Sequence, residues 1–254
     1  MKTLGLLSGK GGVGKSTSAI NLAAALHSLG KQTILIDTNL TTANIGVHLG
    51  SPSNPVTLHH VLQGKNSIHE AIYRHPSGMY FIPGSLALED MDKLKLQNLK
   101  TIKELKADYL ILDGAAGLGK EALATLEHCD ELLIVTNAEL PAMTDALKTI
   151  RIADELGKAI KGVIVTRTKN DKYNISLRNI ESMLEKPVIG VIPEDSSVRE
   201  ALHLKDSLVF THPQSPAAQG YIRLAAAICG AQGPEELKLN WIDKFFKVFK
   251  RIAQ

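Results

Sequence analysis

The sequence predicts a doubly wound α/β protein, in which helices cover both faces of a mostly parallel sheet, followed by a C-terminal amphipathic helix. Short apolar runs alternate along the chain with segments of helical periodicity, a pattern typical of parallel sheets. A glycine-rich turn joins the first apolar run to the first helical segment. The chain has 254 residues, 44% of them hydrophobic, which is enough for one large core. We therefore expect one domain over residues 1–232 and a separate helix over 237–254.

The candidate strands are short runs rich in Val, Ile and Leu, separated by helical segments with their own start and stop signals. The segment Pro141–Leu156, for example, begins with a proline in its first turn and ends at Gly157. In such sheets, ligands bind at the carboxyl ends of the strands. The predicted strands are Thr3–Leu7, Thr33–Ile36, Met79–Ile82, Tyr109–Leu112, Glu131–Thr136, Ile160–Thr166, Pro187–Val191 and a further short one at Leu208–Phe210.

The stretch Ser8–Thr17 (SGKGGVGKST) matches the phosphate-binding loop pattern G-x-x-x-x-G-K-[ST]. It lies between an apolar run and the helical segment Lys15–Leu29, which is the strand–loop–helix setting that a P-loop NTPase requires. Backbone N–H groups of the loop would surround phosphate oxygens at the positive end of the helix. Lys15 would reach the β- and γ-phosphates, and the Ser16 hydroxyl would bind Mg²⁺. The predicted nucleotide-binding residues of the loop are Gly9, Lys10, Gly11, Gly12, Val13, Gly14, Lys15, Ser16 and Thr17.

Two aspartates stand where predicted strands end, beside the predicted phosphate loop. Asp37 follows the second strand and Asp113 follows the fourth. Because the carboxyl ends of parallel strands meet at one edge of the sheet, both side chains are candidates for the magnesium site, Asp113 through a water molecule. The alternative is that each aspartate caps a helix or forms a turn. The predicted metal site consists of Ser16, Asp37 and Asp113.

Composition excludes several classes of protein. The formal net charge is +3, of which residues 237–254 carry +4, so the rest of the chain is close to neutral at −1. A broad nucleic-acid-binding face would need a basic body, and we expect no nucleic-acid partner. The sequence contains no signal peptide and no apolar stretch long enough to span a membrane, and its two cysteines form no C-x-x-C motif. These features predict a cytoplasmic protein with reduced thiols.

The motif KGGVGKST, with its early Lys10, resembles the deviant Walker A motif of the MinD/ParA/Fe-protein group of ATPases. The resemblance covers nearly the whole chain. TNAELPAMTDALK is similar to the group's TNPE…TD segment, and VIVTRTKN and VIGVIPEDSSVREAL resemble its adenine-side strand and the loop after it. VTLHHVLQG and SPAAQ resemble the MinD branch, which includes the flagellar regulator FlhG. The nucleotide-side residues that the resemblance adds are Glu139, Asp145, Arg167, Pro193, Glu194 and Asp195.

The resemblance implies an ATPase that binds ATP or ADP with Mg²⁺ and forms a homodimer when ATP is bound. In this group the early lysine crosses the dimer interface and contacts the partner's ATP, so Lys10 is expected to act in trans. Physically it would resemble an arginine finger, which neutralises charge on the transferring phosphate. The resemblance also implies an unidentified regulatory protein partner.

Two departures from the family pattern fall on the handling of water and γ-phosphate. Asn39 stands where the family has a second acid, and Gly114 replaces a hydroxyl residue. Asn44, which resembles the family's water-contacting asparagine, is retained. We therefore expect nucleotide binding with slow or lost hydrolysis of ATP to ADP and phosphate; alternatively, Asp37 carries the chemistry and Asn39 is neutral. The predicted catalytic residues are Lys10, Lys15, Asp37, Asn39 and Asn44.

The C-terminal segment 237–254 has apolar and aromatic residues on one half of a helical wheel and lysines on the other. Among the residues of its apolar half are Trp241, Phe245, Phe246 and Phe249, although the chain has only five phenylalanines and one tryptophan. This pattern is typical of a helix that lies in a membrane surface, and MinD-like proteins are implied to carry one. The alternative is a terminal helix packed on the body. We expect one tail to bind an anionic membrane weakly and two tails on a dimer to bind well.

These features favour a membrane-associated positioning ATPase of MinD type, which places a division site or a polar structure. An FlhG-like regulator of flagellar or chemosensory placement and a non-hydrolysing ATP-binding scaffold remain alternatives. A ParA-type DNA-partitioning protein fits less well, because such a protein should have a basic body and no amphipathic tail. An iron–sulfur carrier would need cysteines near residues 113–120, where the sequence has none.

Overall fold

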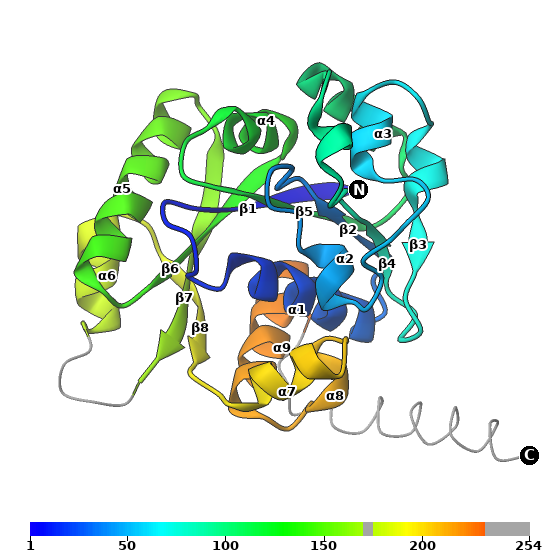
Figure 1. Cartoon of the computed structure of the whole chain (residues 1–254). Coiled ribbons are helices and arrows are strands. Elements are labelled where there is room, and N and C mark those ends of the chain that lie inside the picture. The colour runs from blue at the N-terminus through cyan, green and yellow to red at the C-terminus, as the bar shows by residue number, and fades with distance from the viewer. Residues whose placement is uncertain (170–174, 232–254) are drawn as a thin grey trace, which may run out of the picture.

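The apolar runs form an eight-stranded sheet in the computed structural model, which describes residues 1–169 and 175–231 (Figure 1). The strand order is β3-β4-β2-β5-β1-β6-β7-β8, and every neighbouring pair is parallel except β3 and β4. The first strand therefore lies inside the sheet, between β5 and β6. The strands are β1 (Lys2–Ser8), β2 (Thr33–Asp37), β3 (Tyr73–Arg74), β4 (Tyr80–Ile82), β5 (Tyr109–Ala116), β6 (Glu131–Asn137), β7 (Ala159–Thr168) and β8 (Val188–Pro193).

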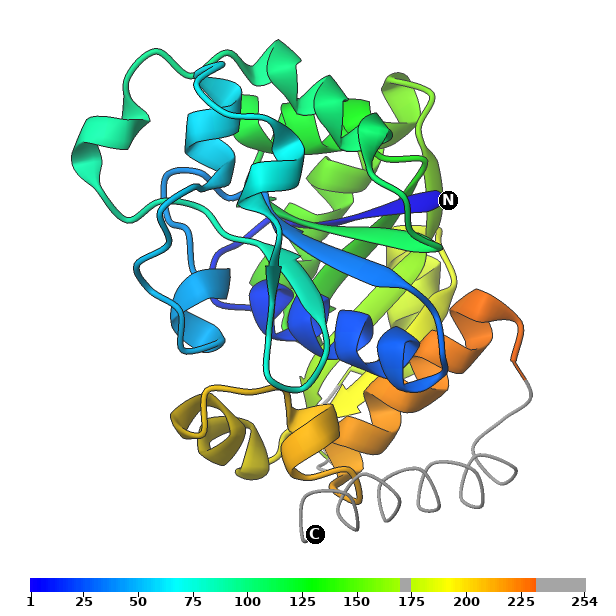
Figure 2. The same ribbon diagram turned by 90° about the vertical axis from the view of Figure 1, so that its right-hand side faces the viewer.

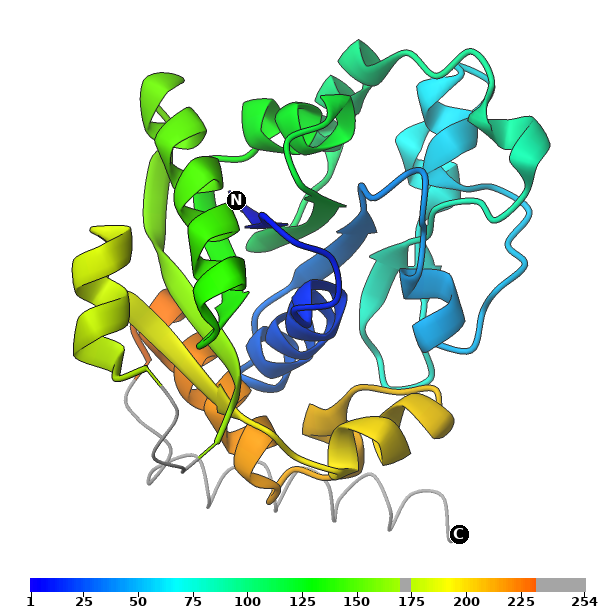
Figure 3. The same ribbon diagram turned by 60° about the vertical axis from the view of Figure 1, so that its left-hand side comes forward.

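Helices cover both faces of this sheet, as the sequence predicts. On one face α1 packs against the central strands and against α9, which lies over the edge strand β8, with α7 and α8 beside them (Figure 2). On the other face α4, α5, α6, α3 and the 3₁₀ helix η3 form the second layer (Figure 3). The helices are α1 (Lys15–Ser28), α2 (Ile45–His48), α3 (Leu58–Leu62), η1 (Ile68–Ala71), η2 (Leu88–Met91), η3 (Leu96–Glu104), α4 (Lys120–His128), α5 (Leu140–Glu155), α6 (Leu177–Leu184), α7 (Ser197–His203), α8 (Leu208–Thr211) and α9 (Pro216–Cys229).

The alternation of side chains along each strand divides the core into two. In β6, Leu133 and Val135 pack into the core on the α1 side of the sheet, while Leu132 and Ile134 pack into the core on the α4 side. Because both faces are covered, the strands are apolar at nearly every position, which explains their appearance in the sequence as continuous apolar runs. The carboxyl ends of β1, β2 and β5, which are neighbours or near neighbours in the sheet, meet at one edge.

The strand predictions are confirmed except for one. The prediction of a strand at Leu208–Phe210 is wrong, because these residues begin helix α8. The Ser207 side chain caps this helix by accepting a hydrogen bond from the backbone N–H of Phe210. Leu208 and Val209 are buried in the α1-side core, and so short an apolar run does not distinguish a strand from a helical turn.

The sequence analysis missed strand β3, which pairs with β4 as an antiparallel hairpin at the edge of the sheet. Its turn contains Gly78, whose φ of 95° is in the left-handed region that favours glycine. No helix in the part of the chain that the structure describes has the length and apolarity to span a bilayer. The predicted amphipathic helix at 237–254 lies outside the described residues.

Candidate functional site

The glycine-rich loop between β1 and α1 is held in place by close backbone packing. A Cβ atom added at Gly9 would lie 2.2 Å from the backbone carbonyl of Asp145 on α5, so only glycine fits there. Gly12 and Gly14 have φ values of 80° and 88°, which glycine adopts without strain. Gly14 is the N-cap of α1, so the loop leads directly into the positive end of this helix.

A side chain from strand β7 of the same sheet also anchors the loop. The Thr166 hydroxyl on β7 donates to the backbone carbonyl of Val13 over 2.6 Å. Three elements that lie far apart in sequence, β1, α5 and β7, thus fix the path of the loop. The loop's backbone N–H groups are therefore preorganised, which is a requirement for binding a phosphate without a large loss of conformational entropy.

A buried ion pair lies at the base of the loop. The Lys15 ammonium is 2.8 Å from Oδ1 of Asp113, and both side chains are almost completely buried. Asp113 also neighbours Asp37 across the β2–β5 ladder, and both aspartates are 0% exposed. One lysine therefore faces two buried carboxylates. If both carboxylates are ionised, the cluster has one more negative charge than positive charges. A buried anion without a counter-charge is strongly destabilising, so the cluster favours binding of a further cation.

Two properties of these aspartates fit a hydrated cation. The second oxygen of Asp113, Oδ2, is buried and has no hydrogen-bond partner among the described residues. Burial, and after it the neighbouring Asp113, raise the pKa of Asp37 to about 7, against the opposing effect of two backbone N–H groups and Lys15. Oδ2 of Asp37 accepts hydrogen bonds from the backbone N–H groups of Asn44 (2.8 Å) and Ile45 (3.0 Å). Hard oxygen ligands of this kind suit Mg²⁺, so the residues present fit the predicted metal.

The loop that follows Asp37 is closed by the side chain of Asn39. The amide of Asn39 donates to the backbone carbonyl of Thr42 over 2.8 Å, and its oxygen accepts from the Thr42 hydroxyl over 3.0 Å. The Asn44 amide donates to the same Thr42 carbonyl. An aspartate at position 39 could not donate this hydrogen bond, so the asparagine has a structural role in the loop conformation described here.

The same loop is attached to helix α4. The backbone N–H and the hydroxyl of Thr41 both donate to the carboxylate of Glu121, and the hydroxyls of Thr38 and Thr125 are 2.9 Å apart. The position of α4 is therefore coupled to the loop after Asp37.

Gly114 is a packing residue in this arrangement. A Cβ atom at this position would lie 2.5 Å from a methyl group of Leu7 and 3.0 Å from the methyl group of Thr125. The space for a larger side chain is thus already filled from β1 and α4. This crowding gives a physical reason for glycine where the family pattern has a hydroxyl residue.

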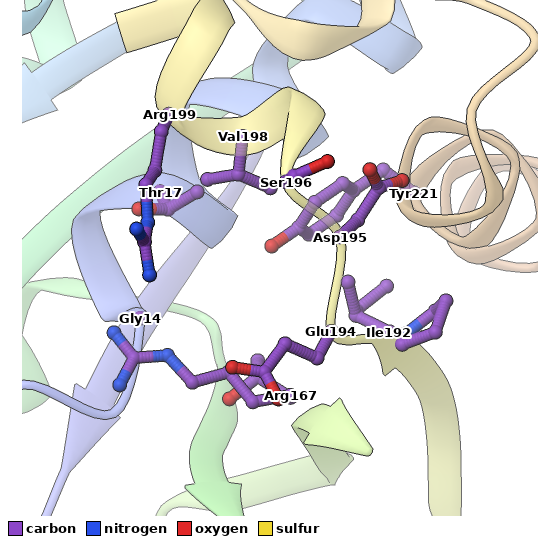
Figure 4. Close-up of a pocket in the computed structure, with 12 residues that line it drawn as sticks. Gly14, Thr17, Arg167, Ile192, Glu194, Asp195, Ser196, Val198, Arg199 and Tyr221 are labelled. Carbon is purple, nitrogen blue, oxygen red and sulfur yellow. The ribbon is translucent and has the colours of Figure 1, made fainter. Parts of the chain in front are cut away.

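Two adjoining cavities open beside the loop, and Gly14, Thr17 and Arg167 line both. The cavity that we call the loop pocket has a volume of about 290 Å³. The cavity that we call the side pocket has a volume of about 480 Å³ (Figure 4). Arg167 has a φ of 52°, which is uncommon for a residue with a side chain.

The side pocket has an apolar wall and a polar rim. Ile192, Val198 and Tyr221 form apolar parts of the lining. Tyr221 is buried, which raises its pKa to about 12, and its hydroxyl is 3.1 Å from that of Ser18. Asp195 lies on the rim and accepts hydrogen bonds from the backbone N–H groups of Ser197 and Ala217. Although its burial acts in the opposite direction, these bonds lower the pKa of Asp195, which joins the first turns of α7 and α9.

The structure brings most of the predicted residues to the two pockets. Gly9 and Val13 shape the loop backbone, and Asp37 and Asp113 are buried beside Lys15. The predicted residues that line the loop pocket are Gly11, Gly12, Gly14, Lys15, Ser16, Thr17, Asn39, Asn44 and Arg167. Those that line the side pocket are Gly14, Thr17, Arg167, Pro193, Glu194 and Asp195.

Besides Gly9, Val13, Asp37 and Asp113, three predicted residues line neither pocket. Lys10 is exposed on the loop. Glu139 is exposed at the N-cap of α5, and the Asp145 carboxylate pairs with Lys148 on the same helix.

The sequence analysis also missed residues that line the pockets. Those that follow β8 lie in the segment VIGVIPEDSSVREAL, whose resemblance to the family's adenine-side loop could have pointed to them. Tyr221 on α9 belongs to no motif. The missed residues are Ser8, Thr42, His48 and Ala116 at the loop pocket, and Thr166, Ile192, Ser196, Val198, Arg199 and Tyr221 at the side pocket.

Comparison with known families and relatives agrees with this geometry. Residues 4–208 match the family described as the CobQ/CobB/MinD/ParA nucleotide binding domain. An uncharacterized ATP-binding protein of Methanocaldococcus jannaschii is 41% identical, over 96% of this chain and 95% of the relative. The septum site-determining protein MinD of Escherichia coli is 28% identical, over 94% and 96%. The antiactivator FleN of Pseudomonas aeruginosa is also 28% identical, over 90% and 86%.

Solved structures of MinD proteins share the fold. The cell division ATPase MinD of Pyrococcus furiosus superposes with a TM-score of 0.86 at 33% identity, covering 90% of this chain and 98% of that protein. The MinD of Pyrococcus horikoshii, solved in complex with Mg-ADP, superposes with a TM-score of 0.85 at 33% identity, covering 89% and 95%. The similarity therefore extends over nearly all of the described residues.

The buried carboxylates predict an unusual pH dependence of stability. The pKa of Asp37 is raised from 3.8 to about 7 in the folded protein, so the folded state holds a proton that the unfolded chain releases. The unfolding free energy should then fall as pH rises from about 4 to about 7. Asp37→Asn should remove this loss and stabilise the protein at pH 8 by about 1–3 kcal/mol, but much less at pH 5.

Urea unfolding at the two pH values, with EDTA present to remove divalent ions, measures this effect. Asp92→Asn, which changes an exposed carboxylate in the same way, is the matched control and should alter stability little at either pH. If Asp37→Asn is no more stable than wild type at pH 8, ionisation of Asp37 beside Asp113 does not destabilise the folded protein, and the interpretation is wrong.

Gly114 and Gly119 provide a matched pair for the packing argument. Gly114→Ala should lower the unfolding free energy by about 1–3 kcal/mol, because the new methyl group meets Leu7 and Thr125. Gly119→Ala should cost no more than about 0.5 kcal/mol, because nothing lies within 4 Å of its added Cβ atom. Denaturant unfolding of both variants measures the difference, and equal losses would show that Gly114 is not sterically required.

Proposed function

The chain belongs to the CobQ/CobB/MinD/ParA nucleotide-binding family as a MinD-like ATPase, and we propose that it is a membrane-associated positioning ATPase that dimerises with ATP. The nucleotides are ATP and ADP, bound with Mg²⁺. The observation that carries the proposal is the buried Lys15–Asp113 pair at the base of a preorganised phosphate loop. A lysine held in this position supplies a fixed positive charge to phosphate groups entering the loop pocket.

Each part of the site has a role in this proposal. Lys15 and the loop N–H groups bind the β- and γ-phosphates, and the Ser16 hydroxyl holds Mg²⁺. Asp37 and Asp113 accept hydrogen bonds from water on the metal and balance the charge of Lys15. When bound, Mg²⁺ neutralises charge on the phosphate oxygens. The side pocket, with its apolar wall and volume of about 480 Å³, accommodates the adenine base.

The loop at residues 39–44 supports slow hydrolysis. Asn39, which lines the loop pocket, cannot accept a proton from water, and both ends of its amide are bonded to Thr42. Loss of one positioned catalytic group commonly lowers the rate by about 10²-fold. The same contacts favour the second candidate, an ATP-binding scaffold that dimerises without turnover. Single-turnover measurement of phosphate release distinguishes the two, with Asn44 and Asp37 as the remaining groups near the expected water.

The exposed side chains around the loop fit a dimer interface. Lys10 is exposed and forms no ion pair with any residue of the described ranges 1–169 and 175–231. Glu139 and Leu140 are exposed at the start of α5, and Leu118 is exposed in the turn between β5 and α4. In the proposal, these groups face the second subunit, and Lys10 contacts the nucleotide bound to that subunit.

The membrane part of the proposal rests on the sequence of the tail. The segment 237–254 carries a charge of +4 and a wholly apolar second face, whereas the rest of the chain is nearly neutral. Weak binding of one tail and stronger binding of two would couple membrane residence to dimerisation. The process served, division-site placement or an FlhG-like role in flagellar placement, depends on an unidentified protein partner, since the MinD of Escherichia coli and the FleN of Pseudomonas aeruginosa are both 28% identical to this chain.

Substitution of the two lysines tests the nucleotide site and the dimer together. Lys15→Ala should abolish binding of ATP and ADP, because the phosphates lose their fixed counter-charge. Lys10→Ala should bind nucleotide nearly as well as wild type but dimerise at least about tenfold more weakly with ATP. Calorimetry measures the first effect and sedimentation velocity the second. Equal loss of nucleotide affinity in both variants would refute the trans role of Lys10.

Liposome sedimentation tests the tail. Vesicles that contain anionic lipid should sediment more protein with ATP than with ADP, and high salt should weaken the effect through screening. Phe245→Asp should reduce sedimentation while ATP-dependent dimerisation persists, because it places a charge in the apolar face. Asn240→Asp introduces the same charge on the polar face and is the matched control. Equal binding with ADP and ATP would mean that the helix is a constant anchor, and loss of folding on removal of 237–254 would mean that it packs in the core.

A further inference from the structure

Arg199 lies on helix α7 and lines the side pocket. It falls within the segment VIGVIPEDSSVREAL but was not among the residues predicted to bind the nucleotide. Its side chain is exposed, and in Figure 4 it extends from α7 toward Thr17 and Gly14, at the side of the pocket nearest the phosphate loop. Arg167 enters the same region from β7, and its guanidinium group lies beside Gly14 in the same view. Two arginines from different elements thus point to the boundary between the two pockets.

The charges around these arginines are not balanced by neighbouring acids. No ion pair within residues 1–169 and 175–231 includes Arg167 or Arg199. The two carboxylates on the rim of the pocket have other partners. Glu194 pairs with Lys169 over 3.1 Å, and both oxygens of Asp195 accept backbone hydrogen bonds. The pocket therefore presents two guanidinium groups that form no ion pair among the residues described, an arrangement that favours an anionic ligand.

We propose that Arg199 is a nucleotide-binding residue that contacts the α-phosphate from the α7 side, opposite Arg167. This inference rests on the proposed nucleotide site. Lys15 and Ser16 line the loop pocket but not the side pocket. Because these residues are the proposed partners of the β- and γ-phosphates and of Mg²⁺, the two phosphates are assigned to the loop pocket. Gly14 and Thr17 line both pockets, so the phosphate nearest the sugar crosses the boundary that they form. Arg199 and Arg167 point to this boundary, where a guanidinium group can bind two phosphate oxygens at once.

Contact with the α-phosphate has a consequence for specificity. ATP, ADP and AMP all carry this phosphate, so Arg199 should strengthen the binding of all three by the same factor. Adenosine lacks it and should gain nothing. The Arg199 side chain would then favour nucleotides over nucleosides. It would also help to retain ADP after hydrolysis, independently of the groups that recognise the γ-phosphate. A guanidinium group that stacked on the base would instead strengthen adenosine binding as well.

The test measures the dissociation constants of ADP, AMP and adenosine by competition with a fluorescent ADP analogue. Arg199→Gln should weaken ADP and AMP equally, by about tenfold, because a charged hydrogen bond at an exposed site is lost. Arg199→Lys should recover a large part of the ADP affinity, since a point charge still attracts phosphate. Arg223→Gln, which removes an exposed charge from α9 outside both pockets, is the matched control and should bind ADP as wild type does.

The outcomes separate this inference from the proposed function. Wild-type protein that fails to bind ADP would refute the nucleotide site itself. Wild-type binding with equal affinities in Arg199→Gln and Arg223→Gln would refute only the role of Arg199. A loss for adenosine as large as that for ADP would show that the guanidinium group contacts the base or sugar and not the phosphate.

Discussion

Two carboxylates that are completely buried at the ends of adjacent parallel strands constrain the rest of the site. Asp37 and Asp113 face each other across the β2–β5 ladder, and burial with mutual repulsion makes their joint ionisation unfavourable. The structure relieves this repulsion only in part. Lys15 pairs with Asp113, and two backbone N–H groups bind Asp37, but one oxygen of Asp113 remains without a partner among the described residues. The arrangement is thus destabilising by itself and favours binding of a further cation.

This constraint extends into the segments that flank the aspartates. The N–H groups that stabilise Asp37 come from residues 44 and 45, so the loop between must fold back over the strand end. Asn39 and Thr42 close that loop, while Thr38 and Thr41 attach it to α4. A change in charge at the aspartates, as on binding Mg²⁺, would act on α4 through these contacts. This coupling between the aspartates and α4 follows from a continuous set of hydrogen bonds in one conformation. A switch would require a second conformation in which these bonds are rearranged.

The departures from the family pattern acquire different meanings in the folded protein. Gly114 is explained by packing, because Leu7 and Thr125 occupy the space that a side chain would need. Asn39 has both a structural role, through its bonds to Thr42, and a place in the lining of the loop pocket. The first departure is compensated locally by neighbouring atoms. The second changes the chemistry available at the pocket, since an amide cannot take a proton from water.

The sequence by itself determined the parts of the protein that are encoded in contiguous segments. The phosphate loop belongs to a contiguous ten-residue motif, Ser8–Thr17, that runs from the end of one strand into the first turn of one helix. Strands buried on both faces appear as apolar runs, so both features could be predicted. Only the tertiary structure decided that Leu208–Phe210 is helical, that Asp113 is paired with Lys15, and that Arg199 and Tyr221 line the side pocket. The physical reason is that these features depend on packing between segments far apart in the chain. The wall of the side pocket comes from α1, β7, β8, α7 and α9, and no local pattern specifies how they meet.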